Sequence, residues 1–145
     1  MSDEHQFCTF FLDKLFFGVE VEKVQEIIRY QEMTRVPLAS QVVAGLINLR
    51  GQIVTAIDLR CRLDLATRSK AKLPLNVVVN VRDETVSLLV DEIGYVLEVD
   101  AEDFEVPPDT LTGNVRSLIR GAYKLQEMLL LILDVEKVVD INSVP

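Results

Sequence analysis

Histidine and cysteine are scarce in this chain, which limits the chemistry that its side chains can perform. The only histidine is His5, and the only cysteines are Cys8 and Cys61. A catalytic triad or an acid–base pair built on histidine is therefore not expected. Without a Cys-x-x-Cys pair or a cluster of histidine and cysteine, we also predict no metal site. The two thiols are expected to stay free rather than to form a disulfide.

Nucleotide-binding motifs and long apolar runs are also missing. The sequence has neither a Gly-x-x-x-x-Gly-Lys-Ser/Thr loop nor a Gly-x-Gly-x-x-Gly motif. Its longest apolar run, residues 128–133, has six residues, whereas a membrane-spanning helix needs about 20. The polar start, Met-Ser-Asp-Glu-His-Gln, is not expected to be a signal peptide. We therefore predict no catalytic residues, no cofactor and no direct membrane insertion.

The charge balance excludes another class of partner. The chain has 23 acidic and 15 basic side chains and a net charge of −8. Because nucleic acid requires a basic protein surface, we predict no nucleic-acid partner. With 145 residues, of which 49% are hydrophobic, the chain can bury a substantial core. This size suits one compact domain or two small subdomains.

What the sequence does contain is an internal repeat. Residues 45–59 align with residues 121–135, so that Gly45 matches Gly121 and Asp58 matches Asp134, each 76 positions apart. Shorter matches link residues 36–37 with 106–107 and residues 21–24 with 90–93. A repeat of this length indicates a duplicated β unit rather than a solenoid. Each copy alone is small for independent folding, so the copies are expected to share buried surface, and binding sites tend to lie at such seams.

The pattern of apolar residues predicts an all-β fold with short helices. Hairpins are expected over residues 7–21 and 77–90, and further strands over residues 45–59 and 129–133, with a turn at Arg50-Gly51. Residues 1–6 are interpreted as a frayed end and residues 67–72 as a polar linker. Asp58 and Asp134 each precede a short helical pattern. We interpret both as helix N-caps rather than as a catalytic pair of carboxylates.

One ordered set of motifs carries a family resemblance. Residues 48–60 read Asn-Leu-Arg-Gly-Gln-Ile-Val-Thr-Ala-Ile-Asp-Leu-Arg. Residues 17–27 read Phe-Gly-Val-Glu-Val-Glu-Lys-Val-Gln-Glu-Ile, and Val36-Pro37 precedes Gly45. This set resembles the CheW family, the adaptor proteins of bacterial chemosensory arrays, over about residues 7–142. One departure is Thr55-Ala56, where the family commonly has a proline after the valine.

The resemblance implies a fold and a function. The implied fold is a single domain, residues 7–142, made of two intertwined five-stranded β-barrels of SH3/OB-like type. The first barrel copy would span about residues 7–68 and the second about residues 73–142. The implied fold also allows strands to be exchanged between the two barrels. The implied protein is not an enzyme but a cytoplasmic adaptor at membrane receptor arrays. Its partners would be the cytoplasmic tip of a methyl-accepting chemoreceptor and the regulatory domain of a CheA-like histidine kinase.

The resemblance also implies a receptor-binding site at Arg50, Val24, Glu26, Gly45 and Asn48. A guanidinium at a turn suits the carboxylates and carbonyls of a helix tip. The same residues are also compatible with purely structural roles. Arg50 could be solvated or paired with Glu26, Val24 could belong to the core, and Gly45 could answer a need for positive φ or close packing.

Two questions stay open at this point. Basic residues gather over 60–72 and acidic residues over 91–105, either as solvated faces or as complementary charges in a head-to-tail ring with the kinase. The alternative function is a small-molecule-binding β-barrel sensor domain. That function requires a deep pocket lined by convergent polar residues, which the sequence does not indicate.

Overall fold

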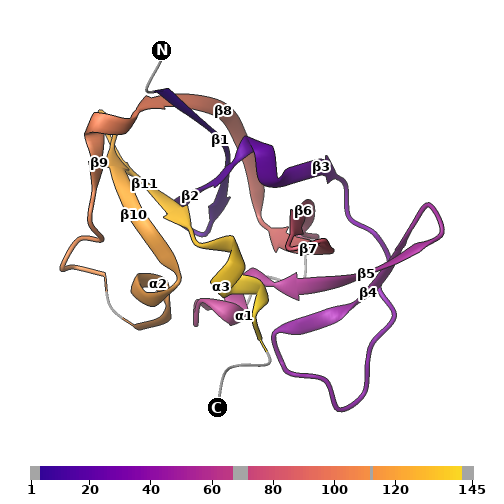
Figure 1. Ribbon diagram of the computed structural model, residues 1–145. Helices are drawn as coiled ribbons and strands as arrows, with labels where there is room; N and C mark the ends of the chain where they lie inside the picture. Colours follow the sequence, from indigo (N-terminus) through magenta and orange to yellow (C-terminus); the bar gives the residue numbers. More distant parts are fainter. Residues whose placement is uncertain (1–3, 67–71, 112, 142–145) are drawn as a thin grey trace.

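The computed structural model describes residues 4–66, 72–111 and 113–141. Within these residues, the strands form two sheets, and three short helices lie beside them (Figure 1). The strands are β1 (Glu4–Leu12), β2 (Leu15–Glu20), β3 (Val24–Ile28), β4 (Val43–Leu49), β5 (Gln52–Asp58), β6 (Leu75–Val81), β7 (Glu84–Val90), β8 (Glu92–Asp100), β9 (Phe104–Glu105), β10 (Ile119–Lys124) and β11 (Leu129–Leu133). The predicted all-β class is confirmed.

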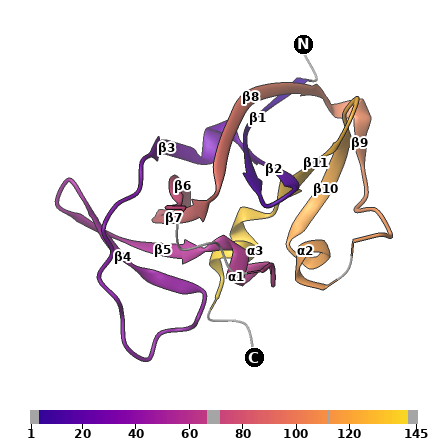
Figure 2. The same cartoon turned by 180° about the vertical axis from the view of Figure 1, so that it is seen from behind.

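Each sheet combines strands from both copies of the repeat. The six-stranded sheet has the order β8-β1-β2-β11-β10-β9, and the five-stranded sheet has the order β3-β6-β7-β5-β4. In both sheets, the hairpin of one copy joins the other copy through a parallel pair, β2 with β11 and β7 with β5. Figures 1 and 2 both show the indigo β1 and β2 beside the orange β10 and β11. The residue limits of the two copies remain a prediction.

Equivalent backbone contacts recur in the two copies. The Asp58 N–H donates to the Val42 carbonyl at 2.7 Å, and the Asp134 N–H donates to the Leu118 carbonyl at 2.9 Å. These two bonds join residues that the sequence repeat predicts to be equivalent. The duplication read from the sequence is therefore present in the folded chain.

The short helices follow the predicted caps. In α1 (Leu59–Arg62), the Asp58 carboxylate accepts from the Cys61 N–H at 3.3 Å. In α3 (Val135–Val139), the Asp134 carboxylate accepts from the Lys137 N–H at 3.2 Å. Both capping predictions are confirmed. The other helical segments are α2 (Gly113–Ser117) and the 3₁₀ turns η1 (Val21–Lys23) and η2 (Ala101–Asp103); none of the helices described has the length and apolar character that crossing a bilayer needs.

The largest hydrophobic cluster is shared by both sheets, and each sheet adds a smaller cluster of its own. Along β11, Leu131 and Leu133 belong to the shared cluster, while Leu130 and Ile132 belong to the smaller cluster of the six-stranded sheet. Successive side chains of a strand point to opposite faces, so this sheet buries apolar residues on both faces. The shared cluster draws on β1, β2 and β5 of the first copy and on β6, β7 and β11 of the second.

Two sequence-based predictions are corrected here. Residues 4–6 are not frayed, because β1 begins at Glu4 and pairs with the end of β8. The strand β8 itself was not predicted, since its acidic residues suggested a solvated segment. The signal was present in the alternation of Ile93, Tyr95, Leu97 and Val99. Most of the predicted linker, residues 67–71, lies outside the described residues.

Candidate functional site

The Arg50-Gly51 turn presents the central arginine of the motif at the tip of a hairpin. Arg50 and Gly51 have φ values of 53° and 89°. Positive φ at both central residues marks the two-residue hairpin turn that fits the twist of β4 and β5. The Asn48 side chain stabilises this turn, because its Oδ1 accepts from the Gly51 N–H at 2.8 Å. The Arg50 side chain is 66% exposed.

Arg50 binds Glu26 through two of its nitrogens. Nη1 donates to Oε1 of Glu26 at 3.0 Å, and Nη2 donates to Oε2. Hydrogen bonds from Arg50 hold the pKa of Glu26 below its usual value, and Glu26 in turn raises the pKa of Arg50. Of the two structural roles compatible with Arg50, solvation and pairing with Glu26, the structure shows the pairing.

This ion pair lies where the two edges of the five-stranded sheet meet. Glu26 is in β3 and Arg50 follows β4, and these strands are the two ends of the sheet order. The segment after β3 also contacts β4, through the bridge between Thr34 and Leu46 with hydrogen bonds of 2.9 and 2.8 Å. The Arg50–Glu26 pair thus connects β3, at one end of the sheet, with the β4–β5 turn at the other end, and both side chains reach solvent.

Two other predicted site residues have clear structural roles. Val24 is partly buried and packs against the shared hydrophobic cluster. A Cβ on Gly45 would lie 2.8 Å from the Thr34 carbonyl oxygen and 2.9 Å from the Met33 Cβ. Close packing, rather than positive φ, therefore requires glycine at this position. Val24 and Gly45 support the strands beside Arg50 and Glu26, and their contact with a receptor stays a prediction.

Ile53 was missed by the sequence analysis. It lies directly opposite Asn48 in the β4–β5 register and is 61% exposed. Residues directly opposite each other in antiparallel strands have their side chains on the same face. Ile53 thus places an apolar side chain beside the Arg50 turn. Ile53 and Val54 are adjacent apolar residues of one strand, and their side chains must point to opposite faces, so the sequence indicated an apolar residue on each face.

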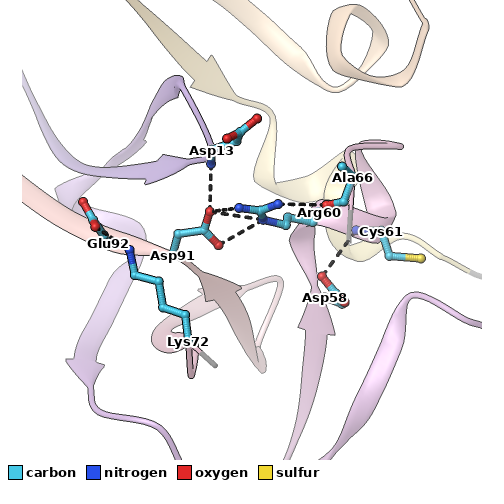
Figure 3. Close-up of polar contacts among 8 residues, drawn as sticks. All are labelled: Asp13, Asp58, Arg60, Cys61, Ala66, Lys72, Asp91 and Glu92. Carbon is cyan, nitrogen blue, oxygen red and sulfur yellow. Dashed lines mark hydrogen bonds and ion pairs between the residues drawn. The ribbon is translucent and has the colours of Figure 1, made fainter. Parts of the chain in front are cut away.

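The second arginine of the motif, Arg60, is held in a different way (Figure 3). Its Nε donates to both carboxylate oxygens of Asp91 at 3.1 Å, and its Nη2 donates to Oδ2. The Asp13 N–H donates to the same Oδ2 at 2.8 Å. Asp91 is only 8% exposed. Hydrogen bonding to Asp91 raises the pKa of Arg60. The contact joins α1, the β1–β2 turn and the residue before β8.

Several residues of the basic and acidic clusters predicted from the sequence contact other parts of the chain. Arg62 is buried and donates to the carbonyls of Val138 and Lys137 at 2.9 and 2.8 Å, a favourable place for a cation at the end of α3. Lys72 and Glu92 form an exposed ion pair at 2.6 Å. The interpretation as solvated faces is therefore wrong for Arg60, Arg62 and Asp91. Arg68 and Lys70 lie outside the described residues.

The described residues offer little for catalysis. Burial raises the pKa of the Cys8 thiol, and burial with nearby acidic residues raises that of Cys61. Both thiols are free and disfavour the reactive thiolate form. Among the residues that the structure describes, no group of three or more His, Cys, Asp or Glu side chains is arranged to hold a metal ion. The exposed Arg50–Glu26 pair and the exposed Ile53 form a surface that suits binding.

Comparison with known proteins gives a consistent match over most of the chain. A family model for the CheW-like domain matches residues 6–142. The chemotaxis protein CheW of Treponema pallidum is 31% identical over 140 residues, covering 94% of this chain and 82% of that protein. The chemotaxis protein CheW of Bacillus subtilis is 32% identical over 127 residues, covering 88% of this chain and 81% of that protein.

A solved structure agrees with the fold. The crystal structure of the scaffolding protein TtCheW from Thermoanaerobacter tengcongensis superimposes with a TM-score of 0.86 at 25% sequence identity. The match covers 95% of this chain and 94% of that protein. The similarity of the fold therefore extends over nearly the whole chain.

Proposed function

The chain belongs to the family of CheW-like domains, and we propose on this basis that it is a non-catalytic adaptor coupling transmembrane chemoreceptors to a histidine autokinase. An adaptor role in chemotaxis is supported by relatives named chemotaxis protein CheW and by the similar scaffolding protein. The proposed partners are the cytoplasmic tip of a methyl-accepting chemoreceptor and a CheA-like regulatory domain. The proposed place of action is the cytoplasm, at membrane receptor arrays. The comparisons do not favour the alternative role as a small-molecule sensor domain.

The observation that carries the receptor proposal is the exposed Arg50–Glu26 pair. Glu26 accepts from two nitrogens of Arg50 and fixes the direction of a side chain that is otherwise free to rotate. A cation fixed in this way loses less conformational entropy when it binds the carbonyls or carboxylates of a helix tip. The exposed Ile53 and the neighbouring Asn48 add an apolar and a polar contact on the same hairpin. We propose that the receptor tip binds Arg50, Glu26, Asn48 and Ile53, with Val24 and Gly45 positioning them.

The test is co-sedimentation of the full chain with a receptor cytoplasmic fragment and the kinase. Arg50→Ala is expected to reduce receptor capture and to leave kinase capture unchanged. A matched control is Arg82→Ala, because Arg82 also has positive φ in a hairpin turn, is 74% exposed and pairs with a glutamate, Glu136, at 3.0 Å. Equal receptor capture by the two variants would argue against the proposed site.

For the kinase, we propose apolar contacts at equivalent loops of the two copies. Val36 and Leu38 precede β4, and Val106 precedes β10 at the matching place of the repeat. All three are exposed, with Leu38 and Val106 at 106% and 79%. A partner built on the same duplicated plan can bind such a loop with one of its own copies. Since apolar contacts supply the affinity and rim charges mainly affect the rate, kinase binding is expected to be only moderately salt-sensitive.

A further inference from the structure

The six-stranded sheet carries a pocket beside its smaller hydrophobic cluster. The volume of the pocket is about 240 Å³. It is lined by His5, Phe7, Glu20, Ala101, Phe104, Arg120, Tyr123 and Ile132. Three of these are neighbouring aromatic rings, since Tyr123 lies 5.6 Å from Phe7 and 5.2 Å from Phe104 between ring centroids. The pocket is separate from the Arg50 hairpin, which belongs to the other sheet.

The internal repeat identifies the equivalent place in the five-stranded sheet. Gly45 and Gly121 are equivalent, and an added Cβ would meet Met33 and Phe104, respectively. The equivalent of Tyr123 is Ile47, at the same spacing as the two glycines. Met33, Ile47 and their neighbours form the small hydrophobic cluster of that sheet. The counterpart cluster of the six-stranded sheet includes Phe7, Tyr123 and Ile132, and these three residues line the pocket.

Two charged residues distinguish the six-stranded sheet from the five-stranded sheet at this place. By the repeat and the parallel strand register, Glu20 is equivalent to Leu89, and Arg120 is equivalent to Ala44. Leu89 is 2% exposed and belongs to this cluster, and Ala44 is partly buried and packs against the cluster. In the open pocket, the Arg120 Nη1 donates to Oε1 of Glu20 at 2.6 Å. A partly exposed ion pair of this kind adds little to the stability of the fold. Stability alone therefore does not explain why Glu20 and Arg120 stand where the other sheet has Leu89 and Ala44.

We propose that this pocket binds a small zwitterion with an apolar side chain, namely a free α-amino acid. Both ion pairs of Glu20, with Arg120 and with Lys23, use its Oε1. Because a carboxylate has about four lone-pair sites and a guanidinium has five donors, Glu20 can also accept from an ammonium group and Arg120 can also donate to a carboxylate. The rings of Phe7, Phe104 and Tyr123 offer a surface for the apolar side chain.

Size and charge both favour this class of ligand. The volume corresponds to about eight water molecules at about 30 Å³ each, which suits a ligand the size of one amino acid. A simple anion would approach Glu20 as well as Arg120, and a simple cation would approach Arg120 as well as Glu20. Only a ligand with both charges close together complements the pair. Such a site would give the adaptor a small-molecule input that is independent of its receptor contact.

The test is calorimetric titration of the full chain with L-phenylalanine and L-leucine. A ligand of this size is expected to bind with a Kd of about 1 mM. The analogues 3-phenylpropionate, which lacks the ammonium group, and phenethylamine, which lacks the carboxylate, are expected to bind at least tenfold more weakly. Nuclear magnetic resonance should show ligand-dependent shifts of Phe7, Phe104 and Tyr123. No binding of either amino acid at 20 mM, or equal binding of the analogues, would overturn the proposal.

The residues at the equivalent place in the five-stranded sheet define a variant that is expected to close the pocket. The double substitution Glu20→Leu and Arg120→Ala installs the residues of the other sheet and is expected to abolish amino-acid binding. The matched control replaces another exposed pair with Arg82→Ala and Glu136→Ala, and it should bind as the original chain does.

If the first double variant does not fold, Arg120→Lys keeps the charge but loses the fork of donors, and binding at least tenfold weaker is expected. Unchanged binding in a folded pocket variant would contradict the assignment. Receptor capture should not change in any folded variant, which separates this test from that of the adaptor site.

Discussion

Arg50 and Arg60 belong to the same motif and each binds a carboxylate with two nitrogens, but their surroundings differ. The side chains of Arg50 and Glu26 are 66% and 24% exposed, whereas those of Arg60 and Asp91 are 13% and 7% exposed. Solvent screens the first pair, so it contributes little to folding and can exchange partners. Removing one member of the second pair leaves a buried charge without its counterion. The same side-chain type thus serves recognition at one place and structure at the other.

The two pairs also connect different parts of the repeat. Glu26 and Arg50 both lie in the first copy and join the edges of one sheet. Arg60 lies in the first copy and Asp91 in the second, and the Asp13 N–H adds the β1–β2 turn to the contact. The exposed pair can therefore change without altering how the copies assemble. The buried pair cannot change in this way, because it connects the two copies.

The largest effect on folding is expected when the two copies of the repeat are separated. Residues 1–70 and residues 71–145, expressed alone, are expected to remain unfolded, because each lacks strands that complete both sheets and half of the shared cluster. Circular dichroism with thermal unfolding is the measurement. Mixing the two pieces should restore part of the folded signal, since the missing strands are then supplied. A cooperative unfolding transition in either isolated piece would show that the copies do not depend on each other.

The next largest effect is expected from the buried pair. Asp91→Ala should lower the free energy of unfolding by about 3–5 kcal/mol, because it leaves the Arg60 guanidinium buried without its carboxylate. Urea unfolding measures the change. Replacing both partners, with Arg60→Met and Asp91→Leu, should be much less harmful. An equal loss in the single and double variants would show that the charge left unpaired is not the cause.

A smaller effect on folding, but a clear effect on binding, is expected at the exposed pair. Arg50→Ala should change the melting temperature by no more than about 2 °C, as for other exposed substitutions. Receptor affinity should fall at least about fivefold if Arg50 is an anchor of the interface. Fluorescence anisotropy with a labelled receptor fragment provides the affinity. A large drop in melting temperature, with unchanged affinity, would reverse the roles assigned to Arg50 and Arg60.

The sequence predicted the features that depend on neighbouring residues. The caps at Asp58 and Asp134 and the turn at Arg50-Gly51 all follow from local preferences of side chain and backbone. The internal repeat was recognisable because Gly45 and Gly121, like Asp58 and Asp134, are 76 residues apart. The resemblance of the motif then pointed to the family that the comparisons support.

The features that were missed depend on contacts between distant residues. The local sequence places Arg50 at a turn, but nothing in it shows that Arg60 is held against Asp91, 31 residues away. The position of Arg62 on the last carbonyls of α3 likewise depends on how the two copies meet. The strand β8 was missed because its acidic residues outweighed a regular apolar alternation. The pairing of strands across the copies also requires the folded structure.

The smallest effect is expected on the pKa of Glu26, which tests whether Arg50 and Glu26 are paired in solution. Hydrogen bonds from Arg50 lower the pKa of this carboxyl, so the folded chain holds the charged form below the usual Glu value of about 4.3. The pair therefore contributes fully above that value and is lost as the pH falls through the lower pKa of the folded state. Nuclear magnetic resonance should give a low midpoint for Glu26 in the original chain and a midpoint nearer the usual value in Arg50→Ala. Arg82→Ala is the control and should leave the Glu26 midpoint unchanged. If the midpoint did not respond to Arg50→Ala, the two side chains would not be paired in solution, and Arg50 would reach the receptor without the support of Glu26.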